Sequence, residues 1–119
     1  MTTGPLAIPP LPEGGYRHAR DIPDAVFLRA VEMASGLYGD RVLPATRWNV
    51  EQVLAGRLPI PRSDFEDIPG VPPKVVLAKF RRVYGRGLVS GCDCGCRGDF
   101  QLTPEGELML MVAESVGGQ

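Results

Sequence analysis

Basic side chains gather in one stretch of the sequence, where they could bind phosphate groups. The stretch from Val71 to Gly98 holds six basic residues and one acid, a formal charge of +5, whereas the rest of the chain has seven basic and thirteen acidic residues. Because the whole chain has a formal net charge of only −1, this sorting predicts a basic surface on one element, as nucleic-acid contacts require. The candidate DNA-binding residues are Lys74, Lys79, Arg81, Arg82, Arg86 and Arg97.

A helix is predicted from about Pro72 to Arg86, since prolines fit its first turn and glycines end it. This helix would present most of these cations on one side. The outer face of this helix would carry cations and small residues but no acid, which suits a DNA major groove. The alternative interpretation is a solvated helix face that keeps the domain soluble. At about 100° per residue, the expected core face consists of Pro73, Val76, Leu77, Phe80, Val83 and Tyr84. The expected outer face consists of Lys74, Ala78, Arg81, Arg82 and Gly85, with Lys79 and Arg86 on one flank.

Three cysteines form the second group with chemical potential. Cys92, Cys94 and Cys96 alternate with other residues, so on a strand their thiols would share one face and could hold zinc. Zinc sites usually leave at least two residues between paired cysteines, however, and no second pair exists. We therefore favour free thiols that pack as small side chains, with metal binding and redox sensing as alternatives. The candidates for a fourth metal ligand are His18, Asp93 and Asp99.

The sequence offers no constellation for catalysis. Asp64, Glu66 and Asp67 form an acidic patch with neither a histidine nor a nucleophile nearby, and the single histidine, His18, has no Ser-His-Asp partners. There is also no phosphate-binding glycine loop and no dinucleotide fingerprint. We therefore expect no enzyme activity and no cofactor.

The N-terminal half predicts an arm followed by two helices. Residues 1–20 begin with a stretch rich in proline and glycine, which predicts an extended arm that lies on the surface or is disordered. A helix is expected over residues 21–39, with the Asp21 side chain as its cap. A short second helix is expected over residues 49–56, with Trp48 anchoring it to the core.

The next part of the chain predicts a helix-turn-helix. A short helix at Ser63–Glu66 would stop at Pro69-Gly70, and the helix of residues 72–86 would follow after a turn of about three residues. A strand at 88–90, a turn at 91–98 and a returning strand at 100–102 then predict a β-hairpin.

A last helix is expected from Pro104 to about Val116, after Thr103 as its cap. We expect its apolar run, Leu108 to Val112, to pack in the core, the alternative being a modest two-fold interface. The predicted fold class is therefore mainly α with a small β-hairpin.

Two segments resemble the winged helix-turn-helix DNA-binding regulators of the MarR and PadR type. In Val71–Val89, the ending Arg86-Gly-Leu-Val resembles the end of their recognition helix, and Arg97–Gly106 resembles their return strand with its Leu-Thr-x-x-Gly. The chain is also similar to small winged-helix proteins of actinobacterial phages.

The resemblance implies a winged helix-turn-helix domain over residues 21–116, with 117–119 as a tail. It implies that the recognition helix, about 72–86, enters a major groove, and that Arg97 in the wing, about 88–102, reaches the minor groove. Those families dimerise through terminal helices longer than the last helix here, so a homodimer stays an open alternative.

We therefore expect a sequence-specific protein that binds double-stranded DNA and regulates transcription. A secretory signal and a membrane span are both missing from the sequence, which predicts a cytoplasmic protein, in the host cytoplasm for a phage product. The alternative function is a winged-helix docking module that binds a host protein or a phage virion assembly.

Overall fold

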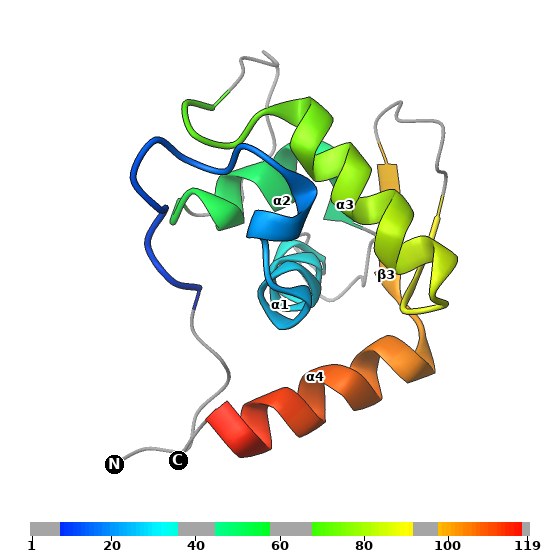
Figure 1. Ribbon diagram of the computed structural model, residues 1–119. Coiled ribbons are helices and arrows are strands. Elements are labelled where there is room, and N and C mark those ends of the chain that lie inside the picture. The colour runs from blue at the N-terminus through cyan, green and yellow to red at the C-terminus, as the bar shows by residue number, and fades with distance from the viewer. Residues whose placement is uncertain (1–7, 36–44, 58–67, 92–97, 118–119) are drawn as a thin grey trace.

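The computed structural model describes residues 8–35, 45–57, 68–91 and 98–117, which form helices around a small antiparallel sheet (Figure 1). The predicted class, mainly α with a β-hairpin, is confirmed at this level, and the sheet has a third strand that the sequence did not predict. In chain order the elements are the 3₁₀ helix η1 (Ala19–Asp21), α1 (Asp24–Ala34), β1 (Ala45–Thr46), α2 (Arg47–Leu54), α3 (Pro73–Gly85), β2 (Val89–Ser90), β3 (Gly98–Leu102) and α4 (Pro104–Gly117).

The sheet has the strand order β1-β3-β2, with both neighbours antiparallel to the central strand β3. Val89 pairs with Leu102 in the predicted hairpin, and Ala45 pairs with Phe100 across the other edge of β3. Strand β1 has only two residues, so it shows no alternation that a sequence pattern could reveal. The hairpin tip at 92–97 lies outside the described residues.

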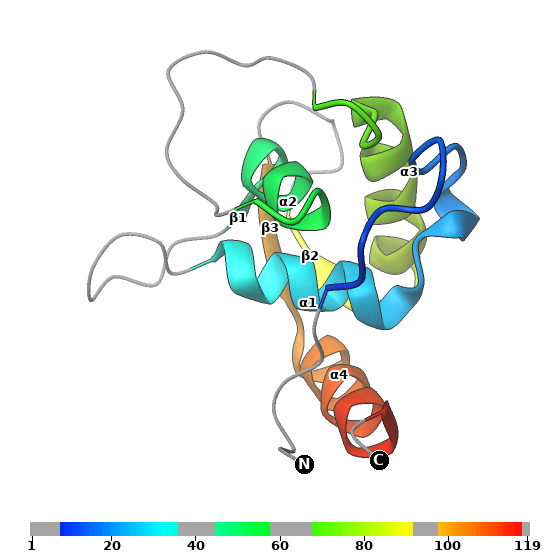
Figure 2. The ribbon, with the colours of Figure 1, turned by 90° about the vertical axis from the view of Figure 1, so that its left-hand side faces the viewer.

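Helix α1 occupies the centre of the domain, between α2 on one side and α4 on the other (Figure 2). Its residues Val26, Phe27, Leu28, Ala30 and Val31 are all buried, because neighbours cover most of its circumference. None of the helices in the described part of the chain is long and apolar enough to cross a membrane.

Helix α1 begins at Asp24, three residues later than the sequence predicted. The Asp21 carboxylate accepts hydrogen bonds from the backbone amides of His18 (3.0 Å) and Arg17 (3.2 Å) instead of capping α1. The expectation for Asp21 is therefore wrong, because a 3₁₀ turn before the helix satisfies this carboxylate. The hydrogen bonds from these amides also lower the pKa of Asp21.

Residues 8–20 pack into the domain and do not form a separate arm. Tyr16 and Ala19 are buried in the core together with Ile22, and the Tyr16 amide donates to the Gly70 carbonyl oxygen (2.8 Å). Gly15 has a φ of +76°, and a Cβ there would lie 2.3 Å from the Gly70 Cα. The expectation of a surface arm therefore does not hold for Tyr16 and Ala19, since two consecutive glycines turn the chain back onto the core. The predicted domain bounds, 21–116, stay a prediction.

Helix α2 begins at Arg47, two residues before the predicted start, because Thr46 is its cap and accepts a hydrogen bond from the Asn49 amide (3.2 Å). Trp48 is only partly buried, and the Arg47 guanidinium lies 5.2 Å from its ring centroid. The predicted helix at 63–66 lies outside the described residues.

Aromatic stacking joins α3 to the sheet. The Phe80 ring lies 4.1 Å from the Phe100 ring, measured between centroids, at an interplanar angle of 13°. Both side chains are fully buried, so this contact fixes α3 against β3 in the middle of the core.

Helix α4 contacts the rest of the domain through one face only. In its apolar run, Leu110 is buried and Met109 is partly buried, but Leu108, Met111 and Val112 are 61%, 64% and 56% exposed. The expectation that the whole run packs in the core is therefore wrong. Five consecutive apolar residues cover the full circumference of a helix, and α4 lies on the surface against α1 and β3.

Gly106 allows α4 to pack closely against the residue that precedes β2, since a Cβ at this position would lie 1.9 Å from the Leu88 carbonyl oxygen. We predict that Gly106→Ala destabilises the protein by about 2 kcal/mol or more, although alanine favours helix by about 1 kcal/mol. Urea unfolding followed by circular dichroism measures the change. Gly85→Ala is the matched control, because a Cβ there meets open space, and it should be neutral or slightly stabilising. Equal effects of the two substitutions would contradict the close contact.

Candidate nucleic-acid interface

The exposed face of α3 is basic and contains no acidic residue. Lys74, Arg81 and Arg82 are exposed, and the small residues Ala78 and Gly85 are exposed between them. The structure therefore brings three of the six candidate DNA-binding residues together on one helix face. A fourth, Arg97, lies outside the described residues.

Lys79 and Arg86 bind a carboxylate of the protein itself. The Lys79 Nζ lies 2.5 Å from Asp24 Oδ1, and the Arg86 Nη1 lies 2.6 Å from Asp24 Oδ2. Lys79 is only 5% exposed, so the expectation that it lies on a solvent-facing flank is wrong. Arg86 keeps half of its side chain exposed and so remains accessible at the C-terminal end of α3.

Helix α3 is rotated about its axis relative to the sequence prediction. Val75 and Lys79 are buried, whereas Tyr84, expected in the core, is 42% exposed. Two contacts account for the difference: η1 lies against α3, and Asp24, the first residue of α1, binds Lys79. A helical wheel gives the relative angles of side chains but not which side a distant segment covers, so the sequence missed this rotation.

The Asp24 carboxylate is held in its charged form. Burial raises its pKa, but the hydrogen bonds and charges of Lys79 and Arg86 outweigh this effect and lower the pKa overall. The carboxylate thus links the first turn of α1 to two turns of α3.

The turn that precedes α3, at Pro69-Gly70, lies within the described residues. An isolated bridge joins Ile68 to Val71 across Pro69-Gly70, and Gly70 has a φ of +86°. Helix α2 contacts α3, and 18 residues separate the end of α2 at Leu54 from the start of α3 at Pro73. The predicted helix-turn-helix also needs the 63–66 helix, which lies outside the described residues, and so it stays a prediction.

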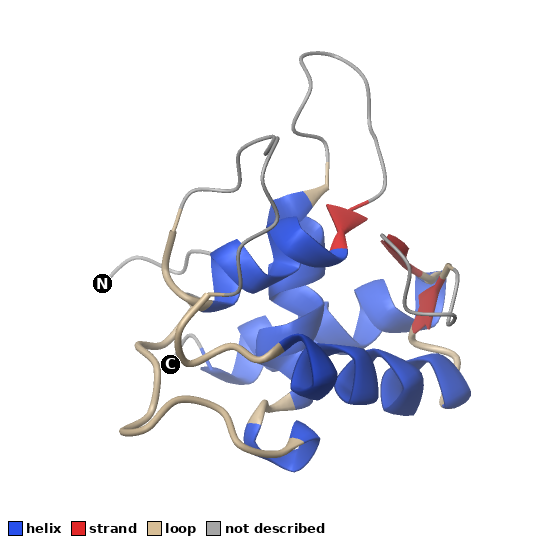
Figure 3. Ribbon diagram, turned by 90° about the horizontal axis from the view of Figure 1, so that it is seen from above, coloured by secondary structure: helices blue, strands red, loops and turns tan. Residues whose placement is uncertain are grey.

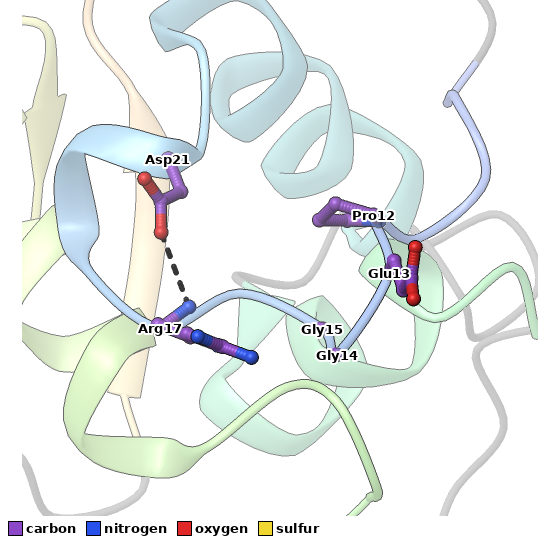
Figure 4. Close-up of a pocket in the computed structure, with 6 residues that line it drawn as sticks. All are labelled: Pro12, Glu13, Gly14, Gly15, Arg17 and Asp21. Carbon is purple, nitrogen blue, oxygen red and sulfur yellow. Dashed lines mark hydrogen bonds between the residues drawn. The ribbon is translucent and has the colours of Figure 1, made fainter.

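An open depression lies beside the N-terminal segment (Figure 4). Within it, the Asp21 carboxylate is already occupied by the Arg17 amide, as the dashed line shows. The depression therefore offers no free buried polar group that would select a ligand. It is lined by Pro12, Glu13, Gly14, Gly15, Arg17 and Asp21.

The described residues contain no cluster of three or more His, Cys, Asp or Glu side chains that could hold a metal ion. Cys92, Cys94 and Cys96, together with Asp93, fall in the undescribed hairpin tip, and the acidic patch of Asp64, Glu66 and Asp67 falls in the undescribed 58–67 segment. The predictions for these residues stay untested.

No family model, curated protein or solved structure matches this chain.

Replacing Asp24 with asparagine should destabilise the protein by about 2 to 3 kcal/mol at pH 7, because the buried Lys79 ammonium would lose its partner. Glu32→Gln is the control, since it removes the more exposed Arg29–Glu32 pair on α1 and should cost well under 1 kcal/mol. Urea unfolding measures both changes. Equal stability of Asp24→Asn and the native protein would contradict the structural role of this ion pair.

The same carboxylate predicts a pH dependence of stability. Since the folded pKa of Asp24 is below its unfolded value of about 3.9, its contribution is fully present above about pH 4 and is lost as the pH falls through the folded pKa. The unfolding free energy of the native protein should therefore fall more steeply between pH 5 and 2.5 than that of Asp24→Asn. Parallel curves for the two proteins would contradict this linkage.

Proposed function

We propose that this chain is a winged helix-turn-helix protein that binds double-stranded DNA in a sequence-specific manner and regulates transcription. The observation that carries the proposal is the exposed face of α3, on which Lys74, Arg81 and Arg82 surround small side chains and no acid is present.

The geometry of α3 supports recognition in a major groove. An α-helix has a diameter of about 10–12 Å with its side chains and fits a groove about 12 Å wide. Ala78 and Gly85 allow close approach, arginine can bond guanine in a bidentate manner, and lysine can bind a phosphate. The half-exposed Tyr84 adds a hydroxyl donor for the phosphate backbone.

The order of the elements supports the proposed fold. A packed helix pair, α2 and α3, is followed directly by the hairpin β2–β3, and β3 also pairs with β1. In a winged helix this hairpin is the wing beside the recognition helix, and Arg97 would extend from its tip.

Selection of bound fragments from random duplex DNA at moderate salt tests binding and specificity together. We predict an enriched motif and an affinity that falls steeply with salt. Replacing Arg81 and Arg82 with alanine should cost about 1 to 3 kcal/mol for each side chain that reads a base edge. Arg29→Ala on α1 is the control for loss of charge. No enriched motif, or an unchanged affinity in the double variant, would overturn the proposal.

Protein docking is the second candidate function, and the outer face of α4 is the observation that favours it. Leu108, Met111 and Val112 follow one another at i, i+3 and i+4, so they form one exposed apolar stripe. The occupant would be a host protein, a phage virion assembly or, in a homodimer, a second copy of this chain.

Met111→Glu should abolish docking through this stripe with little change in stability, since Met111 is 64% exposed. Light scattering of the native protein and the variant detects self-association, and a nuclease-treated pull-down detects a stoichiometric protein partner. Self-association or a partner that is present with the native protein and lost with Met111→Glu would support docking. Identical behaviour of the two proteins would remove α4 as a docking surface.

A further inference from the structure

We propose that Arg17 and Arg20 bind the phosphate backbone of DNA beside α3, an inference that rests on the proposed DNA-binding function. These two arginines, called here the arm arginines, precede α1 and belong to the segment that the sequence predicted to be a separate arm. They would add a second element to the interface, one that contributes affinity and orientation but reads no base.

The arm arginines lie alongside α3 because their segment is fastened near both ends of that helix. At one end, the Tyr16 amide donates to the carbonyl oxygen of Gly70, three residues before α3 begins. At the other end, Asp24 binds Lys79 and Arg86 in the C-terminal half of α3. Between these two points η1 contacts α3 directly.

The figures place the N-terminal segment and α3 on one side of the molecule. In Figure 1 the blue N-terminal segment with η1 and the yellow-green helix α3 both lie towards the viewer, and in Figure 2 both lie on the right. Seen from above in Figure 3, the tan loop and short helix of the segment follow the same edge as α3. The two elements therefore lie on the same side of the molecule.

Both arm arginines are exposed, and neither forms an ion pair with another residue in the described part of the chain. Their backbone is nevertheless fixed, because the Asp21 carboxylate closes the turn through the amides of Arg17 and His18. A rigid backbone lowers the entropic cost of binding a ligand through these side chains.

The combined surface has a strongly positive charge. Residues 14–24 and 70–87 together contain seven basic and two acidic residues, a formal charge of +5 in a chain whose net charge is −1. Both acids are already bonded: Asp21 to backbone amides and Asp24 to two cations. The exposed charges of Arg17 and Arg20 are therefore available for an anionic partner of repeating charge, such as a DNA strand.

The dimensions of DNA explain why this position meets phosphates and not bases. A helix seated in the major groove fills its width, so an element packed against the side of that helix faces the sugar-phosphate strand at the groove edge. The segment runs beside α3, which is about 20 Å long, over much of its length. This geometry points to backbone contacts by Arg17 and Arg20.

Salt titrations of binding test the inference. The probe is a 30-base-pair duplex of random sequence, whose affinity for native protein, Arg17→Gln, Arg20→Gln and the double variant is measured by fluorescence anisotropy from 50 to 200 mM salt. Each lost phosphate contact lowers the slope of log affinity against log salt by about 0.9, so the double variant should lose about 1.8. Between 50 and 200 mM salt, the factor by which its affinity falls should therefore be about 12 times smaller than the factor for the native protein.

Two controls separate this effect from a general loss of charge or of folding. Arg29→Gln removes one charge from α1 and should leave the slope unchanged, and Arg17→Lys with Arg20→Lys should retain most of the slope because the charges remain. Thermal unfolding verifies that each variant is folded, as expected for the exposed side chains of Arg17 and Arg20.

The outcomes distinguish this inference from the proposed function. Suppose that the native protein binds the duplex, and that replacing Arg81 and Arg82 with alanine weakens binding. If the double glutamine variant then keeps the native slope, the arm arginines are not in the interface, and only this inference is overturned. If Arg29→Gln lowers the slope as much as Arg20→Gln, a general charge effect likewise overturns it. If the native protein does not bind DNA, both proposals are overturned.

Discussion

The ion pairs of Asp24 with Lys79 and Arg86 determine which surface α3 presents. Lys79 is almost fully buried, and a buried ammonium without a partner would be strongly unfavourable. Because Asp24 is the first residue of α1, its carboxylate fixes the rotation of α3 relative to the central helix of the domain. The rotation in turn leaves Lys74, Arg81 and Arg82 exposed. Among the candidate cations that the structure describes, one carboxylate thus separates the pair that it binds, Lys79 and Arg86, from the three that lie on the exposed face of α3.

The N-terminal segment completes this arrangement. Gly15 lies so close to Gly70 that a side chain at Gly15 would clash with the Gly70 backbone. Tyr16, the next residue, is buried. The segment therefore follows α3 to Asp24 as part of the same packing unit. Its two exposed arginines therefore belong to a segment that lies against α3, although the segment and the helix are about 50 residues apart in the chain.

The molecule presents two chemically different surfaces. The side formed by α3 and the N-terminal segment is cationic, whereas the outer face of α4 is apolar and has only acidic charges among its residues. Phosphate binding and apolar docking have opposite requirements, so the two proposed functions do not compete for the same residues. A protein that used both surfaces would bind DNA through α3 and a protein through α4.

The sequence by itself determined the local features. Prolines at its start and glycines at its end delimited α3, alternation identified the β2–β3 hairpin, and Thr103-Pro104 marked the start of α4, because capping and turn chemistry depend only on neighbouring residues. The sorting of charge into one segment was likewise visible in the sequence. Only the tertiary structure decided the rotation of α3, the burial of Lys79 and Tyr16, the exposure of the α4 stripe and the existence of the two-residue strand β1. Each of these depends on which distant segment covers a given face, and side-chain spacing within one element carries no information about that partner.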